Sequence, residues 1–367
     1  MSQENVNKVR AWLSEQNIAA LLVTQPQNRS YLSGWLCDDP EGAGVLLVSQ
    51  QQQIVLTNPL YAEVVQREAV GWEVIVSEGR EYAPLLVAQA QKYAWHCIGF
   101  ESSAITYAEY EKLRIAGENV YSLHPFEQSY VSTLRLVKQP HELELLKRAV
   151  AITDEAFAYI CRWIEPGVTE KELEWEIVRQ MVERGADGPA FGTIVASGPN
   201  GSMPHARSGA RRIQRGEFIT IDMGARYKGY CADMTRTICL GEPAEPRMLK
   251  VYDAVLNAMK TCEAGLHAGM SGPAADALAR NALDTANLSQ HFVHGTGHGV
   301  GLQVHEGLSL SPRAPEDVTL PAGCVVTVEP GVYIPESIGV RIEDCVLVKE
   351  DGIEVLTQSP TELVIQR

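Results

Sequence analysis

The stretch FITIDMGARYKGYCADMTRT, residues 218–237, decides the fold of the second half of the chain. Two β-like runs, FITIDMG and CADMTRT, flank the turn-rich ARYKGY, and this arrangement predicts a β-hairpin. Asp222 and Asp233 stand in the two runs, on either side of a turn centred near Tyr227 and Lys228. Such a hairpin puts the two carboxylates side by side on one face, where unpaired like charges repel. A divalent cation between them would turn this repulsion into attraction.

Two further acids share this setting, in which a carboxylate stands inside an apolar, strand-like run. Glu329 lies in VVTVEPG and Glu343 lies in GVRIED. A carboxylate buried in a sheet is costly unless it is paired or bound to a metal. His298 lies in the glycine-rich HGTGHGVG, where small residues let the backbone come close to a site. Four carboxylates and one imidazole form a hard donor set that suits Mn²⁺ or Co²⁺ and exceeds what one ion needs.

The chemistry that this donor set favours is hydrolysis. Two ions about 3.5–4 Å apart can share one water, lower its pKa toward neutrality and hold the attacked carbonyl group. His205 and His305 are the remaining candidates for acid–base work. Taken singly, each acid could be an ordinary turn or strand-end residue, and Cys231 and Cys345 are interpreted as small core thiols. The joint pattern, rather than any one residue, favours a metal centre.

Length, composition and charge narrow the kinds of protein that this chain can be. The 367 residues are 45% hydrophobic and 21% charged, which is enough for two domains with real cores and argues against disorder. The net charge of -15 disfavours nucleic acid and anionic membranes as partners. The polar start MSQENVNKVR has no signal-peptide pattern, and no apolar run approaches the roughly 18 residues that span a bilayer. Eight cysteines without a C-x-x-C pair indicate reduced thiols, so we expect a cytoplasmic protein.

The first third of the chain alternates helical and strand-like patterns, which predicts an α/β domain with a central sheet over residues 1–130. We expect helices over residues 6–14, 61–67, 82–93 and 105–115, and strands over residues 19–23, 44–48, 54–56, 72–76 and 97–100. Residues 131–140, VSTLRLVKQP, are expected to form a linker, because Pro140 suits the first turn of a long helix that follows.

Residues 141–367 are expected to form the second domain, with helices packed on a curved, mainly antiparallel sheet (α+β). The expected helices span residues 141–163, 169–185, 247–264 and 273–286. Thr169 followed by Glu172 has the spacing of a capping box. Besides the hairpin, the strand-like segments are residues 292–304, 324–328, 340–348 and 353–356.

Five blocks of the chain, in order, resemble the creatinase/aminopeptidase ("pita-bread") family, and within it the Xaa-Pro peptidases of the aminopeptidase P and prolidase type. The blocks are MPHARSG (203–209), TIDMGARYKGYCADMTRT (220–237), HGTGHGVGLQVHEG (294–307), VVTVEPGVYIP (325–335) and GVRIED (339–344). Upstream, NRSYLSGW (28–35) and LRLVKQPHELELLKRA (134–149) are similar to the N-terminal domain and linker of the same enzymes. The resemblance implies a creatinase-like N-terminal domain and a pita-bread catalytic domain.

The resemblance also implies a role for each matching residue. The five implied metal ligands are Asp222, Asp233, His298, Glu329 and Glu343. Asp233 and Glu343 would bridge both ions, and Glu329 would also shuttle the proton of the bridging water. His305 would bond the carbonyl oxygen as it becomes an oxyanion, and His205 would steady the scissile amide. The implied substrate-binding residues are His294, Val304, Tyr333 and Arg341, with Val304 and Tyr333 around a proline ring.

One stretch departs from the family pattern. The family commonly shows His-Glu-x-Pro, whereas Gly307-Leu308 follows His305-Glu306 in this chain. We expect this departure to loosen the loop on the pocket side, while all five ligand positions stay intact.

The implied activity is hydrolysis of the N-terminal Xaa-Pro bond of short peptides with proline at the second position. The implied cofactors are two divalent metal ions, with Mn²⁺ expected and Co²⁺ or Zn²⁺ as alternatives. An Xaa-Pro dipeptidase (prolidase) is the alternative reading, followed by a methionine aminopeptidase and a non-catalytic peptide-binding homologue. A homodimer is also implied, and we expect the loop 34–42, GWLCDDPEG, to reach a neighbouring subunit's site.

Overall fold

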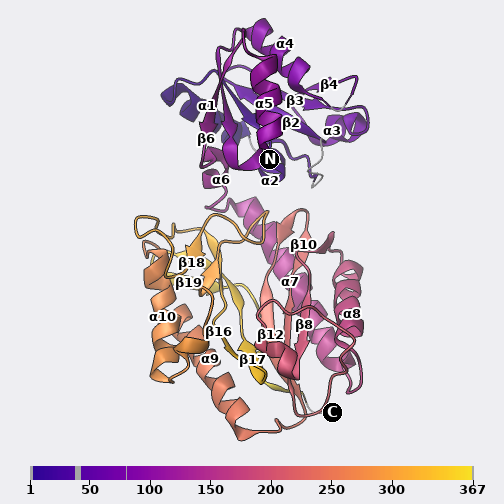
Figure 1. Cartoon of the computed structure of the whole chain (residues 1–367), viewed down its shortest axis with the longest axis vertical. Coiled ribbons are helices and arrows are strands. Elements are labelled where there is room, and N and C mark those ends of the chain that lie inside the picture. Colours follow the sequence, from indigo (N-terminus) through magenta and orange to yellow (C-terminus); the bar gives the residue numbers. More distant parts are fainter. Residues whose placement is uncertain (1–2, 38–42, 80, 366–367) are drawn as a thin grey trace. The chain divides into compact units, whose positions relative to one another are not determined.

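The computed structural model describes residues 3–37, 43–79 and 81–365 (Figure 1). The chain divides into two compact units, Met1–Arg135 and Leu136–Arg367. Positions 38–42 of the loop that was expected to reach a neighbouring subunit lie outside the described residues.

The first unit is built on a six-stranded mixed sheet with the order β4-β3-β2-β1-β5-β6. Its strands are β1 (Ala20–Val23), β2 (Gly44–Ser49), β3 (Gln53–Thr57), β4 (Glu73–Val76), β5 (Cys97–Glu101) and β6 (Ser122–Phe126). The pairs β1–β2 and β2–β3 are antiparallel, and the pairs β3–β4, β1–β5 and β5–β6 are parallel. The strands alternate with helices, as the sequence pattern predicts for an α/β unit.

The helices of the first unit are α1 (Gln3–Glu15), α2 (Pro26–Ser33), α3 (Ala62–Glu68), α4 (Ala83–Tyr93), α5 (Tyr107–Ala116) and α6 (Tyr130–Leu134). Helix α2 has no apolar periodicity that would predict it. It begins with Pro26, whose fixed φ suits a first helical position, and it ends at Gly34, which has φ 84°.

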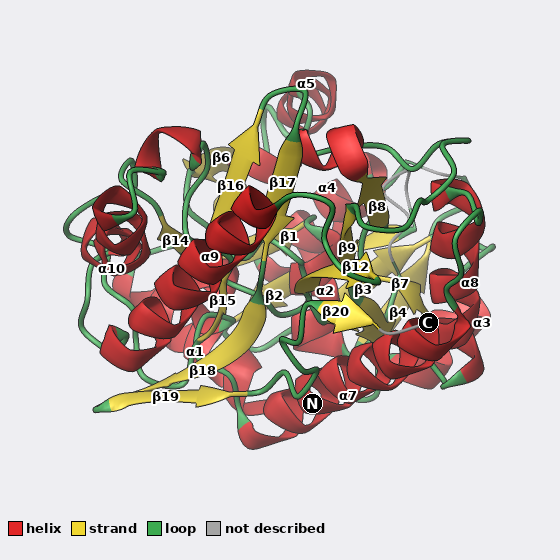
Figure 2. Ribbon diagram, turned by 90° about the horizontal axis from the view of Figure 1, so that it is seen from below, coloured by secondary structure: helices red, strands yellow, loops and turns green. Residues whose placement is uncertain are grey.

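The second unit places strands between two pairs of helices (Figures 1 and 2). The helices are α7 (Pro140–Trp163), α8 (Glu170–Glu183), α9 (Pro246–Gly265) and α10 (Gly272–Thr285). Helices α7 and α8 share one apolar core with residues such as Ile221 and Ile238, while α9 and α10 share a second core with residues such as Val326 and Val346. The predicted capping box is confirmed, because Thr169 and Glu172 exchange both hydrogen bonds at the start of α8.

Short strands connect the two cores. One sheet has the order β20-β12-β9-β8 and another the order β15-β18-β19. The strands of the unit are β7 (Gly188–Pro189), β8 (Ile194–Ser197), β9 (Phe218–Met223), β10 (Ala225–Tyr227), β11 (Tyr230–Cys231), β12 (Met234–Leu240), β13 (Gly297–His298), β14 (Ser309–Leu310), β15 (Val325–Val328), β16 (Gly331–Ile334), β17 (Ile338–Arg341), β18 (Asp344–Lys349), β19 (Gly352–Val355) and β20 (Val364–Ile365). Within residues 136–365, β12–β20 is the only parallel pair, so the expected mainly antiparallel α+β class is confirmed.

The prediction of a strand over residues 292–304 is wrong. Within this segment only β13 is a strand, and it pairs with β14. A Cβ atom on Gly297 would lie 1.9 Å from the Thr327 carbonyl oxygen, and one on Gly299 would lie 2.0 Å from the Glu306 carbonyl oxygen. The glycines therefore serve close backbone packing around His298 rather than an extended strand.

The segment 340–348 is divided between two strands rather than forming one, since β17 ends at Arg341 and β18 begins at Asp344. Glu343 stands in the break between them. Among the described residues, no helix is both long and apolar enough to cross a membrane.

Candidate metal and catalytic site

The predicted hairpin is present, but its turn lies one residue later than expected, so the partner of Asp222 is two residues further along the chain. Asp222 pairs with Thr235, and the turn lies at Lys228-Gly229, where φ is 47° and 84°. Two successive positive φ values are typical of a tight two-residue hairpin turn. Because Asp233 stands two residues before Thr235, it is a diagonal neighbour of Asp222 on the same face rather than its direct partner.

Nearly all the predicted site residues line one cavity of about 480 Å³ in the second unit. Those that line it are His205, Asp222, Asp233, His294, His298, Val304, His305, Glu329, Arg341 and Glu343. Tyr333 is the exception, and it is 5% exposed. Its hydroxyl group lies 2.9 Å from His294 Nε2 and accepts a hydrogen bond from Arg341 Nη1 at 2.7 Å. Tyr333 thus braces two residues that line the cavity instead of lining it.

The acids and His298 converge from four separate places in the chain. Donor atoms of Asp233, His298 and Glu343 all lie within 4.8 Å of one another. His298 Nε2 is 3.4 Å from Glu329 Oε1 and 3.6 Å from Asp233 Oδ2. Its Nδ1 lies 3.2 Å from the Gly299 carbonyl oxygen. A hydrogen bond from Nδ1 to that carbonyl leaves Nε2 free to bind a metal ion.

Four carboxylates this close together would repel one another strongly if all were ionised and no cation lay between them. Burial and the nearby Glu343 raise the pKa of both Asp233 and Glu329 well above their usual range. Burial and then repulsion from Asp222 raise the pKa of Glu343 to about 8. Burial also lowers the pKa of His298 to about 4, so its short contacts with the acids are not ion pairs near neutral pH.

Two observations test whether a divalent cation fits these residues. The donor set consists of carboxylates and one imidazole, which suits a hard cation that would supply the missing positive charge. Asp222 Oδ1 is buried and has no hydrogen-bond partner among the described residues, whereas Asp222 Oδ2 accepts a hydrogen bond from Arg341 Nη2 at 2.7 Å. A buried carboxylate oxygen without a donor is costly unless a cation binds it. The residues therefore fit a metal centre.

Three further imidazoles lie around the acids. The rings of His298 and His305 are 4.1 Å apart between centroids. Burial lowers the pKa of His294 to about 4 and also lowers the pKa of His305. His205 is exposed and lies on the loop that follows β8. A neutral imidazole such as that of His305 can donate an N–H toward an oxygen atom that gains charge during a reaction.

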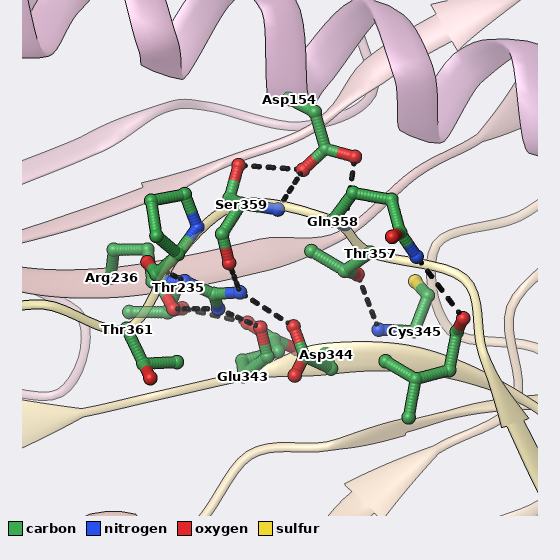
Figure 3. A network of polar contacts seen from close by, with 12 residues as sticks. Asp154, Thr235, Arg236, Glu343, Asp344, Cys345, Thr357, Gln358, Ser359 and Thr361 are labelled. Atoms are coloured by element: carbon green, nitrogen blue, oxygen red, sulfur yellow. Dashed lines mark hydrogen bonds and ion pairs between the residues drawn. The ribbon is translucent and has the colours of Figure 1, made fainter.

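A buried arginine that sequence reasoning did not single out lies behind Glu343 (Figure 3). Arg236 is 1% exposed, and it donates all five of its N–H groups. The acceptors are the carbonyl oxygens of Thr235, Glu343, Ser359 and Pro360 and a carboxylate oxygen of Asp344. Thr235 Oγ1 in turn donates to Glu343 Oε2 at 2.6 Å. The one sequence signal was a charged residue inside the apolar run MTRTICL, a position that needs a buried partner.

The loop in which the chain departs from His-Glu-x-Pro is closed rather than loosened. Glu306 N–H donates to the Gly299 carbonyl, and Gly299 N–H donates to the Leu308 carbonyl. Leu308 N–H donates to the Glu306 carbonyl at 2.6 Å around Gly307, which has φ 61°, so the three residues form a γ-turn. Glu306 also forms a buried ion pair with Lys138 at 3.0 Å. A proline at position 308 could not donate the hydrogen bond that closes this turn.

The chain is similar to known proteins over nearly its whole length. Residues 144–350 match the model of metallopeptidase family M24, and residues 5–137 match the creatinase/prolidase N-terminal domain. An Xaa-Pro dipeptidase structure from Bacillus anthracis is 37% identical with a TM-score of 0.91, covering 98% of this chain and 99% of its own. An X-Pro aminopeptidase structure from Thermotoga maritima is 32% identical with a TM-score of 0.87, covering 96% and 99%. The Xaa-Pro dipeptidase of Pyrococcus furiosus is 32% identical over 362 residues, covering 99% and 100%.

Proposed function

The chain belongs to metallopeptidase family M24 and is a metal-dependent hydrolase, and from this premise we propose that it hydrolyses the Xaa-Pro bond at the amino end of short peptides. The observation that carries the proposal is the single cavity lined by four carboxylates and four imidazoles. The names of the relatives from Bacillus anthracis, Thermotoga maritima and Pyrococcus furiosus support proline as the second residue of the substrate.

We propose that two divalent ions occupy this cavity, with Mn²⁺ as the physiological metal and Co²⁺ or Zn²⁺ as substitutes. Their ligands would be Asp222, Asp233, His298, Glu329 and Glu343. Such a centre supplies an activated water and polarises the scissile carbonyl. Metal analysis of the purified protein tests this assignment, because absence of bound Mn, Co and Zn would favour a non-catalytic peptide-binding protein.

The side chains around the acids have separate tasks in the proposed reaction. The water oxygen bonds to the carbonyl carbon, the C–N bond breaks, and one water proton moves to the proline nitrogen. Glu329 accepts that proton and passes it on, because its carboxylate lines the cavity beside the other proposed ligands. His305 donates an N–H to the carbonyl oxygen as its charge develops, and His205 steadies the scissile amide.

The proline ring and the substrate's amino group need different surroundings. An Xaa-Pro bond has no amide N–H, so a site for it needs an apolar slot rather than a hydrogen-bond acceptor. Val304 lines the cavity together with Phe191 and Ile194, and we assign these residues to the ring. His294 and Arg341, which Tyr333 braces, complete the substrate side.

Dipeptides are a second candidate substrate class, favoured by the relatives that are named Xaa-Pro dipeptidases. Hydrolysis of Ala-Pro and Ala-Pro-Ala with added Mn²⁺ separates the two. Cleavage of the tripeptide identifies an aminopeptidase, and cleavage of Ala-Pro alone identifies a dipeptidase. Cleavage of neither peptide, with Met-Ala-Ser accepted instead, would refute the proline proposal in favour of a methionine aminopeptidase.

We also propose a cytoplasmic homodimer. The cysteines of the described residues are all free, which supports a reducing compartment. Light scattering of the purified protein measures the assembly state. If the loop 34–42 reaches a neighbouring subunit, trimming it will change the preference for peptide length, and an unchanged preference would refute that contact.

A further inference from the structure

Glu170 is the first residue of α8, and its carboxylate is fully buried at 0% exposure although it does not line the cavity. Oε1 accepts hydrogen bonds from Ser197 N–H at 2.8 Å and from the Ser197 hydroxyl at 2.8 Å. Oε2 accepts the Gly209 N–H at 3.1 Å. The Asn200 side-chain amide donates to both oxygens, at 3.0 and 3.1 Å. A buried carboxylate with this many donors is held in one position.

These donors lie at the two ends of one loop. Ser197 is the last residue of β8, and Gly209 is the last residue of the MPHARSG block. Between them the chain carries Pro204 and His205, both of which line the cavity. One carboxylate thus joins the start and the end of the segment that presents His205. Closing a loop at its base restricts the positions that its tip can reach.

Other contacts also hold the two ends of this loop, at Ser197 and Gly209, together. Lys171 N–H, next to Glu170, donates to the Gly209 carbonyl at 3.0 Å. Arg211 donates to the Ser197 hydroxyl at 2.6 Å and so brings a positive charge close to the buried carboxylate. On the cavity side, Arg341 Nη1 donates to the Pro204 carbonyl at 3.3 Å. The loop is therefore held at its base by Glu170 and near its tip by Arg341.

We propose that Glu170 is a positioning residue that acts through His205, holding this imidazole where the scissile amide of the substrate lies. This inference rests on the proposed function, because it takes His205 to contact the substrate. A side chain displaced by about 1 Å from its working position can cost about 100-fold in rate. Glu170 contributes by preventing that displacement and touches neither the substrate nor the metal ligands.

The test is a double-mutant cycle with Glu170→Gln and His205→Ala, measured as kcat/KM on whichever Xaa-Pro peptide the wild type cleaves. Glutamine keeps the size of Glu170 but puts an NH₂ group where an acceptor is needed, so one set of donors loses its partner. When His205 is present, we expect Glu170→Gln to lower kcat/KM about 10- to 100-fold. In the His205→Ala background the same change should cost less than about twofold. An equal loss in both backgrounds would overturn the proposal.

Hydrogen exchange gives a readout that does not depend on activity. In Glu170→Gln, amides of residues 203–209 should exchange about tenfold faster or more, with Mn²⁺ affinity measured by titration unchanged. Unchanged exchange in this segment would contradict the proposal. If Glu170→Gln does not fold, Asn200→Ala removes two of the same hydrogen bonds from the loop side and takes its place.

The matched control is Glu174→Gln on the same helix, where a partly buried carboxylate at the surface pairs with Lys171. It should leave both kcat/KM and the exchange of residues 203–209 at wild-type values. A wild type that cleaves no Xaa-Pro peptide would refute the proposed function. The exchange experiment would still decide whether Glu170 holds the loop.

Discussion

At the scale of single residues, the two oxygens of Asp222 have different surroundings. Arg341 donates to Oδ2, while Oδ1 is buried and finds no hydrogen-bond partner in the part of the chain that the structure describes. Asp233, its diagonal neighbour, is 6% exposed and lies among three other acids. These acids gain from proximity only when a cation lies among them, so removal of one ligand should affect binding and catalysis together.

We predict that Asp233→Ala abolishes turnover and lowers the affinity for Mn²⁺ about 100-fold or more, because it removes a ligand that is proposed to bridge both ions. Peptide hydrolysis and calorimetric titration measure the two effects. Asp253→Ala changes an exposed acid on α9 and serves as the control, with no expected effect. Retained activity in Asp233→Ala would rule out the bridging role.

His294 makes stability depend on pH in a defined direction. Burial lowers its folded-state pKa from 6.5 to about 4, so between these values the unfolded chain binds a proton that the folded protein does not. The stability that comes from neutral His294 is therefore present above about pH 6.5 and is lost as the pH falls to about 4. We predict that the drop in Tm between pH 7 and pH 5 is smaller in His294→Gln than in the wild type. His267→Gln, which changes an exposed histidine, should show the wild-type drop.

At the scale of elements, the turn of the central hairpin carries a residue that does not suit its backbone. Lys228 has φ 47°, a region that asparagine tolerates better than lysine. We predict that Lys228→Asn raises the free energy of unfolding by about 0.5 kcal/mol with unchanged kcat/KM. Urea unfolding measures this change. A loss of stability would mean that the Lys228 side chain contributes more than its backbone strain costs.

Contacts of the C-terminal segment also matter at this scale, because Arg236 on β12 joins Ser359 and Pro360 to the backbone of Glu343 (Figure 3). Lysine has three donors in place of five, so Arg236→Lys leaves buried acceptors unpaired. We predict a loss of about 2–4 kcal/mol in unfolding free energy and weaker Mn²⁺ binding. Arg247→Lys, at an exposed pair with Glu245, should change neither quantity. If the Arg236→Lys variant folds and its Mn²⁺ affinity is unchanged, Arg236 does not contribute to metal binding.

Helices with strong apolar periodicity were predictable from the sequence, and those with little were not. Helix α7 begins at Pro140 and α8 at its predicted capping box. Helix α2 could not be predicted, since its polar sequence is held by tertiary burial of residues such as Tyr31. The segment 292–304 reads as a strand because its apolar residues alternate with glycines, whose role lies in close packing that spacing alone does not reveal.

At the scale of the whole molecule, the net negative charge and the acids of the cavity both favour the binding of divalent cations. A net charge of -15 attracts divalent cations, and the acids of the cavity repel one another without them. We predict that chelator treatment lowers Tm and abolishes turnover, and that Mn²⁺ restores both. At a free Mn²⁺ concentration of 100 times Kd, the gain should be about 2.7 kcal/mol. Mg²⁺ at the same concentration serves as the control for general charge screening.

The members of the site were predictable from sequence motifs, and their arrangement was not. The acids and histidines stand out because polar residues in apolar runs need partners. The diagonal placement of Asp222 and Asp233 depends on a turn one residue later than the pattern suggests. Arg236 and Glu170 could not be singled out from the sequence, since most of their hydrogen-bond partners lie far away in the chain.

The contacts of Arg236 with Ser359 and Pro360 tie the surroundings of Glu343 to a stretch 123 and 124 residues away from this arginine. Proteolytic removal of Ser359 and Pro360 would leave two hydrogen bonds of a buried guanidinium group without acceptors, although it would remove none of the proposed metal ligands. Limited proteolysis of this stretch should therefore weaken metal binding from a distance.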